Sequence, residues 1–312
     1  MTASTDRILP GVALMLGFCL FAPLIDVSSK LATQTVPVGQ VTLARFIVQT
    51  VLMLPILVLL GQGVRMTARA FRLTLWRALA SIAATFTFVW AVSHMPIADA
   101  LAIAFVEPFI LLIFGKLMFN DEVGPRRIAA SGVGFIGALM VIQPSFATFG
   151  WVALLPVGTA FAFAAYMLIT REASRHMTPE AMQFHTAWVA ALICLPMVAL
   201  AEGSGIVTLD PVMPEGWAWA WLLGVGVAAT VSHMFMTYAL KLAPSATLAP
   251  LHYLEIVSAA TLAYLVFGDF PNAWTWTGIG VIVASGLYII HRERVTAAQA
   301  RATRRQAGSA AG

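Results

Sequence analysis

Residues 105–115 read FVEPFILLIFG and place a single carboxylate, that of Glu107, in the middle of a long apolar run. A charged side chain at such a depth in hydrocarbon costs roughly 2.5–3.5 kcal/mol on insertion scales. The whole chain is 60% hydrophobic and only 10% charged, so each buried charge needs a physical reason. We therefore expect this segment to cross a membrane with Glu107 facing protein or water rather than lipid.

Apolar stretches of about 20 residues, the length of a helix that crosses a bilayer, recur along the whole chain. Ten are expected, at residues 8–28, 38–60, 74–93, 97–118, 126–143, 150–170, 181–201, 216–238, 244–266 and 274–291. The short connections leave no room for a soluble domain, and the first stretch is too long for a cleaved signal peptide. The predicted fold class is all-α integral membrane, with ten transmembrane helices.

Positive charges are distributed unevenly between the two sets of connections. If the N-terminus is cytoplasmic, sixteen of the 18 Lys and Arg residues fall on the cytoplasmic side, Arg77 among them; Lys30 and Arg45 are the exceptions. This asymmetry is the one that the positive-inside rule describes. Both termini are therefore predicted in the cytoplasm, and the basic tail 292–312 is expected to be disordered.

Several other classes of protein are not favoured. Cys19 and Cys194 both lie inside predicted spans, so we expect neither a disulfide framework nor a metal site. The positive net charge is explained by membrane topology, so no nucleic-acid partner is expected. No phosphate-binding loop indicates an ATP-driven pump, and no cofactor is expected.

The sequence contains an internal repeat that appears when it is shifted by 148 residues. Residues 90–142 then fall on 238–290 without a gap. The aligned identities include Pro96 with Pro244, Glu107 with Glu255, Phe119 with Phe267, and Asp121 with Asp269. The repeat predicts two halves of five helices each, 1–143 and 144–291.

An odd number of helices in each half makes the second half cross the membrane in the opposite direction. Inverted repeats are typical of secondary transporters, whose sites lie near the bilayer midplane where the halves meet. We therefore expect Glu107 and Glu255 at equal depth on facing helices, both bordering a protein-lined cavity.

Three motifs of the first half and one long segment of the second resemble the drug/metabolite transporter superfamily, and within it the EamA-type ten-helix transporters. They are MPIADALAIAFVEPF, FNDEVGPRR and GVGFIGALMVIQP, and APLHYLEIVSAATLAYLVFGDFPNAWTWTGIGVIVASGLYIIHRE. The resemblance implies an inner-membrane carrier whose two inverted halves enclose a central cavity and alternate its access. The first span departs from the family, because FAPLIDVSSK stands where a Trp-Gly pair is common.

The two glutamates are the first site candidates. Glu107 and Glu255 suit binding of a cationic group or carriage of a coupling proton, and the structural alternative is a hydrogen bond to a neighbouring helix. Pro108, directly after Glu107, is either a hinge or an ordinary tolerated proline.

Three charged residues of the first two spans are further candidates. Asp26 and Lys30 are four residues apart and share a helical face, where they form either a gate at the outer mouth or a local pair with Lys30 reaching the headgroups. Arg45 lies deep in the second span and needs a partner. Asp26 or a substrate carboxylate would serve, and we expect Arg45 to line or close the cavity.

Aromatic side chains are frequent within the spans and are mostly expected to pack in the core. Trp90 and Tyr238 occupy equivalent repeat positions, which favours them as a pair that lines a pocket for a flat ring. His252 precedes Glu255 by three residues and would titrate with it or hold it in place. Small residues such as Gly134 and Gly280 indicate close helix packing or a homodimer contact.

These features favour a secondary transporter of a small organic molecule, in contact with the lipid bilayer. A membrane enzyme would show clustered ligands or a nucleophile with its base, and a structural or signalling protein has no use for two symmetric buried acids. Riboflavin or a similar flat heteroaromatic metabolite is the first substrate hypothesis, taken up into the cell. Proton-coupled export of amino acids, amines or other metabolites is the alternative.

Overall fold

The computed structural model describes residues 8–62, 66–107, 109–110, 113–114, 125–242, 254–285, 287–288 and 291. Within these ranges every regular element is a helix. The helices are α1 (Ile8–Ala32), α2 (Val38–Leu59), α3 (Ala68–Val92), α4 (Ile97–Ala104), α6 (Pro125–Phe149), the 3₁₀ helix η2 (Gly150–Leu154), α7 (Leu155–Ala173), α8 (Pro179–Leu200), α9 (Ala218–Leu242) and α11 (Leu254–Phe267), followed by a helix at Ala273–Ser285.

The all-helical fold class is confirmed for these residues, and six helical stretches are long and apolar enough to cross a membrane. Helical residues occur in each of the ten expected ranges. Ranges 97–118 and 244–266 extend outside the described residues, so ten spanning helices stay a prediction. The tail 292–312 also lies outside the described residues.

Helix boundaries follow from local chemistry. The hydroxyl of Thr67 accepts a hydrogen bond from the Ala70 amide at 3.2 Å, and that of Thr178 accepts one from the Ala181 amide at 3.3 Å, which caps α3 and α8. At the other end of a helix, Gly268 adopts a φ of 73° directly after α11, a conformation that favours glycine.

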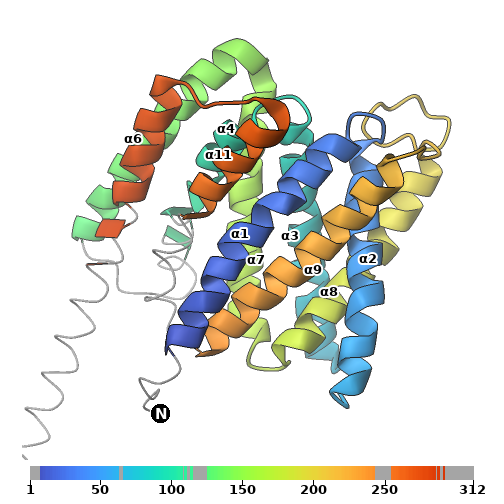
Figure 1. Cartoon of the computed structure of the whole chain (residues 1–312). Coiled ribbons are helices and arrows are strands. Elements are labelled where there is room, and N and C mark those ends of the chain that lie inside the picture. Colours follow the sequence, from blue (N-terminus) through green and yellow to red (C-terminus); the bar gives the residue numbers. More distant parts are fainter. Residues whose placement is uncertain are drawn as a thin grey trace, which may run out of the picture.

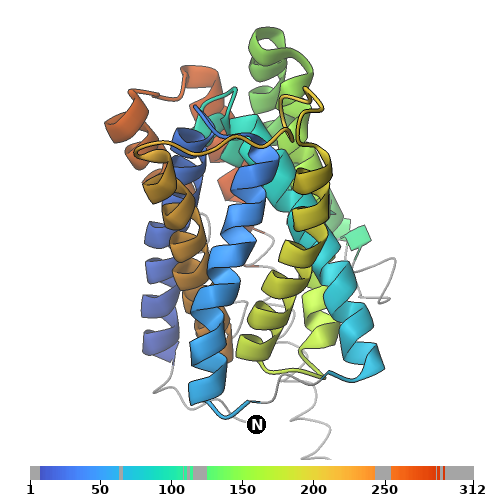
Figure 2. The same cartoon turned by 90° about the vertical axis from the view of Figure 1, so that its right-hand side faces the viewer.

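The helices pack as a closed ring. Neighbours in contact follow one another in the order α1, α9, α2, α8, α3, α7, α4 and α11, and α11 returns to α1. Figures 1 and 2 show the long helices standing side by side, with α6 beside α4 at one side of the bundle. The ring alternates between helices of the predicted first and second halves for much of its length, so the interior is built by both.

Connections gather at the two ends of this bundle (Figure 1). At one end, the Gly39 amide donates to the Thr208 carbonyl at 2.8 Å, which ties the start of α2 to the connection between α8 and α9. At the opposite end, the Arg69 guanidinium lies 2.7 Å from the Glu172 carboxylate and links α3 to α7. Successive connections at opposite ends of the bundle are what a multi-pass membrane protein requires.

Glycines allow some helices to approach closely. A Cβ on Gly226 of α9 would lie 2.3 Å from the Val48 Cβ of α2, and a Cβ on Gly134 of α6 would lie 2.0 Å from the Phe109 ring. Gly280 would meet nothing within 4 Å, so close packing at the predicted small residues is confirmed for Gly134 but not for Gly280.

Candidate functional site

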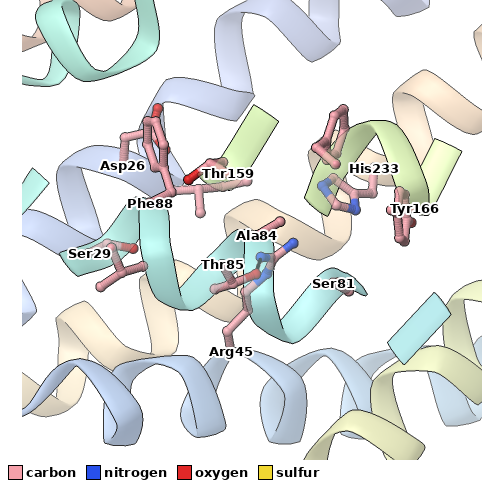
Figure 3. A pocket seen from close by; sticks show the side chains of 13 residues that line it. Asp26, Ser29, Arg45, Ser81, Ala84, Thr85, Phe88, Thr159, Tyr166 and His233 are labelled. Carbon is pink, nitrogen blue, oxygen red and sulfur yellow. Dashed lines mark hydrogen bonds between the residues drawn. The ribbon is translucent and has the colours of Figure 1, made fainter. Parts of the chain in front are cut away.

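A cavity of about 130 Å³ lies inside the helix ring, and α1, α2, α3, α7 and α9 contribute its walls (Figure 3). Its polar lining comes from every one of these helices. The lining residues are Ile25, Asp26, Ser29, Arg45, Ser81, Ala84, Thr85, Phe88, Val89, Thr159, Phe163, Tyr166 and His233. The sequence predicted Asp26 and Arg45 as site candidates, and the structure brings them together in this cavity.

Arg45 projects from α2 toward α3 (Figure 3). Its Nη1 donates to the hydroxyl of Thr85, and its guanidinium lies 5.3 Å from the centre of the Phe46 ring. Its Nε is buried and has no hydrogen-bond partner. An unsatisfied buried donor costs about 1–3 kcal/mol, more when it belongs to a charged group. The site therefore carries an open donor on a fixed positive charge.

Asp26 and Ser29 lie one turn apart on the same face of α1. The Ser29 hydroxyl is buried without a partner, and the Asp26 side chain is 8% exposed. No ion pair joins Asp26 to Arg45 among the described residues, although the carboxylate is within Coulombic range of both Arg45 and Glu255. The cavity thus contains a carboxyl group and a guanidinium group that do not form an ion pair with one another.

Tyr166 links the cavity to a buried arginine that the sequence placed elsewhere. The expectation that Arg77 belongs to an inner connection is wrong, because its side chain lies inside α3 and is only 2% exposed. Arg77 donates to the Thr170 hydroxyl at 2.8 Å, to the Met182 carbonyl at 2.9 Å, and to the hydroxyls of Thr186 and Tyr166. Its position inside a helical stretch indicates a buried role, and hydroxyl residues on α7 and α8 can accept its hydrogen bonds. The count of Lys and Arg residues on each side of the membrane overlooked this.

This network fixes how Tyr166 meets the cavity. The phenolic oxygen accepts the Arg77 hydrogen bond, so its own O–H remains available as a donor. The Phe163 and Tyr166 rings are stacked with centroids 5.6 Å apart, and Phe88 and His233 add further rings to the wall. The lining can therefore pack against a flat group while several donors point at it.

The two predicted glutamates are both buried, each 7% exposed, but neither is among the residues that line this cavity. α4 ends at Ala104, and after a turn at 105–106 Glu107 is again helical, so an interruption of the helix directly precedes it. Glu255 is in the first turn of α11, where the Ser258 hydroxyl donates to the Cys19 carbonyl of α1.

Lys30 does not form the predicted local pair with Asp26, while its role as a gate at the outer mouth stays a prediction. Its Nζ lies 2.8 Å from the Asp269 carboxylate, donates to the Met95 carbonyl at 3.2 Å, and stands 4.8 Å from the centre of the Phe267 ring. The reason is depth: Asp26 lies one turn further into the bundle, whereas Lys30 is in the last turn of α1 and faces the connection after α11.

The predicted aromatic pair lies outside the lining of this cavity. The Trp90 ring stands edge-on to Trp151 with centroids 4.9 Å apart, and Tyr238 shares a side-chain hydrogen bond with Glu180. His252 lies outside the described residues. Thr85 and Ser29 are lining residues that the site prediction missed, because isolated hydroxyls in apolar helices carry no periodic signal.

Comparisons with known proteins cover nearly the whole chain. The profile of the EamA-like transporter family matches residues 9–143 and 150–291. A protein of Brucella anthropi named riboflavin transporter is 25% identical over 90% of this chain and 99% of its own length. A protein of Rickettsia prowazekii named S-adenosylmethionine uptake transporter is 26% identical over 94% of this chain and 97% of its own length. One crystal structure matches with a TM-score of 0.63 at 17% identity, over 91% of this chain and 97% of that one.

Proposed function

Because the chain belongs to the EamA-like transporter family and is a multi-pass membrane transporter rather than an enzyme, we propose that it is a secondary carrier of a small organic metabolite. The observation that carries this proposal is the cavity between the helices whose lining combines Asp26, Ser29 and Arg45 with hydroxyl and aromatic groups of α3, α7 and α9. A polar chamber enclosed by helices of both halves is where a secondary carrier holds its substrate.

Alternating access rests on two inverted five-helix repeats, 1–143 and 144–291. The helix contacts support this division. In this division α1, α2, α3 and α4 correspond to α7, α8, α9 and α11. The contacts α1–α9, α2–α9 and α1–α11 therefore correspond to α7–α3, α8–α3 and α7–α4, and helices of every one of these pairs touch. The carrier rocks one group of helices against the other around the cavity.

The carrier sits in the inner membrane with both termini in the cytoplasm. The uneven placement of Lys and Arg supports this orientation. Arg69, with its ion pair to Glu172, then lies at the cytoplasmic end, and the pair of Lys30 with Asp269 lies at the outer end. Glu107 and Glu255 act beside the cavity as sites for a coupling proton or for a cationic part of the cargo.

Riboflavin, or a similar flat heteroaromatic metabolite, is the cargo that we propose, moved into the cell. The aromatic wall of Phe88, Phe163 and Tyr166 and the small number of fixed charges support a flat and mostly neutral molecule. The relative named riboflavin transporter, which this chain covers almost completely, gives independent support.

Export of an amino acid, an amine or another metabolite by proton exchange is the second candidate. The observation that favours it is a carboxyl group, Asp26, in the same cavity lining as Arg45, a cationic group with an unpartnered donor. Such a set can hold an ammonium and a carboxylate at the same time.

Uptake by whole cells separates the two candidates. A riboflavin auxotroph that expresses the chain is expected to accumulate labelled riboflavin faster than cells with an empty vector. A matched strain with the exposed change Arg69→Lys is expected to behave as wild type. Equal accumulation with and without the chain, at confirmed membrane expression, rejects riboflavin uptake and leaves the second candidate.

A further inference from the structure

One edge of the Arg45 guanidinium, formed by Nε and Nη2, is available to bind a ligand. Its Nη1 is engaged by Thr85, and its Nε is buried without a partner. The remaining edge of the fork, formed by Nε and Nη2, is the one that receives two acceptor atoms side by side. The side chain is itself only 8% exposed, so bulk water does not supply these acceptors freely.

A second unsatisfied group stands in the same cavity. The Ser29 hydroxyl is buried and unpartnered on α1, across the chamber from α2, and its side chain is 1% exposed. Tyr166 adds a third donor, because Arg77 already occupies an acceptor position of its oxygen. Arg45, Ser29 and Tyr166 can thus each donate a hydrogen bond into the cavity, and Asp26 is the one carboxylic acid among its lining residues.

Size limits what can fill the chamber. Its volume of about 130 Å³ is close to the roughly 150 Å³ of a cavity known to hold one benzene ring. The chamber therefore has room for one ring-sized part of a substrate.

We propose that this chamber recognises a planar group with two adjacent hydrogen-bond acceptors, a carboxylate or a ring imide, which docks on the Nε–Nη2 edge of Arg45 in a cavity whose wall also includes Ser29 and Tyr166. This inference rests on the proposal that the cavity is the substrate site, and it does not depend on riboflavin being the substrate. Asp26 faces the same group and favours one that carries an N–H or an ammonium next to its acceptors.

Calorimetric titration of the purified full chain in detergent tests the proposal with three ring-sized probes. Benzoate carries an anionic acceptor pair, thymine carries a neutral imide, and benzylamine carries a cation without acceptors. We expect benzoate or thymine to bind more tightly than benzylamine. The tighter-binding of these two probes shows whether the recognised acceptor pair belongs to a carboxylate or to a ring imide. Tightest binding of benzylamine, or no binding of benzoate and thymine, overturns the proposal.

Variants connect the binding to the named groups. Arg45→Lys keeps the charge and removes the fork, so the Kd of the preferred probe is expected to rise at least tenfold. Ser29→Ala is expected to raise it about threefold, and Thr85→Val, which frees Nη1, by a similar factor. The matched controls Arg69→Lys and Ser204→Ala, both on exposed residues, are expected to leave it unchanged.

If Arg45→Lys does not fold, the Ser29 and Thr85 variants decide alone, and unchanged Kd values in both overturn the proposal. Riboflavin uptake is measured separately. Probe binding that depends on Arg45, in a chain that fails to transport riboflavin, retains this inference and rejects riboflavin as the cargo.

Discussion

Lys30 and Asp269 form an ion pair of 2.8 Å between residues that are 239 positions apart in the sequence. The pair joins the last turn of α1 to the connection that follows α11, and the Met95 carbonyl accepts from the same ammonium. Three segments of the chain thus meet at one lysine, at the end of the bundle that the proposed topology places outside. We interpret this contact as a latch that holds this end closed.

Breaking the latch is expected to open that end. The side chains are 18% and 30% exposed, and a pair that is this accessible contributes about 1 kcal/mol, or roughly a fivefold shift in the closed population. A cysteine at the lining position Ala84 should therefore react about fivefold faster with an impermeant maleimide in Lys30→Ala, in a background without Cys19 and Cys194. The charge-swapped double variant Lys30→Asp with Asp269→Lys should restore slow labelling, and equal rates in all three proteins would exclude the latch.

Arg77 is expected to be needed for stability. Arg77→Met removes hydrogen bonds to Thr170, Thr186, Tyr166 and the Met182 carbonyl, and charge-assisted hydrogen bonds are worth about 1.5–3 kcal/mol each. We expect the apparent Tm of the purified protein in detergent to fall by several degrees or more. Arg69→Met, on a side chain that is 60% exposed, serves as the control. A Tm equal in the two variants would show that the buried network contributes nothing.

Contact between α2 and α9 is expected to depend on Gly226. Gly226→Ala places a methyl group 2.3 Å from the Val48 Cβ, so one helix must move, and overpacking of this kind costs about 1–3 kcal/mol. Gly132→Ala in α6 is the matched control, since its Cβ would meet nothing within 4 Å. Thermal unfolding should separate the two variants, and equal Tm values would argue against close packing at Gly226.

The buried glutamates are expected to be required for transport and not for insertion. Glu107→Gln and Glu255→Gln keep the side-chain volume and remove the charge that either role needs. The initial transport rate should fall at least tenfold in each variant, while the amount of protein in the membrane fraction stays at the wild-type level. Wild-type rates in both single variants would assign the two carboxyl groups a purely structural role.

Much of the fold could be predicted from the sequence, because the length of an apolar helix is set by the thickness of the bilayer. The end of α4 at Ala104 is a partial exception with a local cause. The sequence has a proline at position 108, and a proline lacks the N–H that a helix would donate to the carbonyl four residues earlier, which disfavours a continuous helix here. The proline was visible in the sequence, but whether it would bend the helix or end it depended on packing.

Partners of the charged side chains were harder to predict. A deep arginine needs hydrogen-bond acceptors. Arg45 lines the cavity, but its contact there is with Thr85, a neutral hydroxyl that no charge pattern marks. Lys30 was paired with its helical neighbour because the sequence offers only local spacing, whereas Asp269 approaches through tertiary packing. Equivalent repeat positions also do not imply a shared pocket, as the separate surroundings of Trp90 and Tyr238 show.

The central claim is that the Arg45 cavity lies on the transport path of a secondary carrier. Exchange of labelled riboflavin into proteoliposomes loaded with unlabelled riboflavin, without any nucleotide, tests it most directly. The account predicts exchange well above that of protein-free liposomes, and a loss of at least tenfold in Arg45→Lys with Arg69→Lys unaffected. Exchange no faster than in protein-free liposomes, or equally fast in Arg45→Lys and wild type, would contradict it.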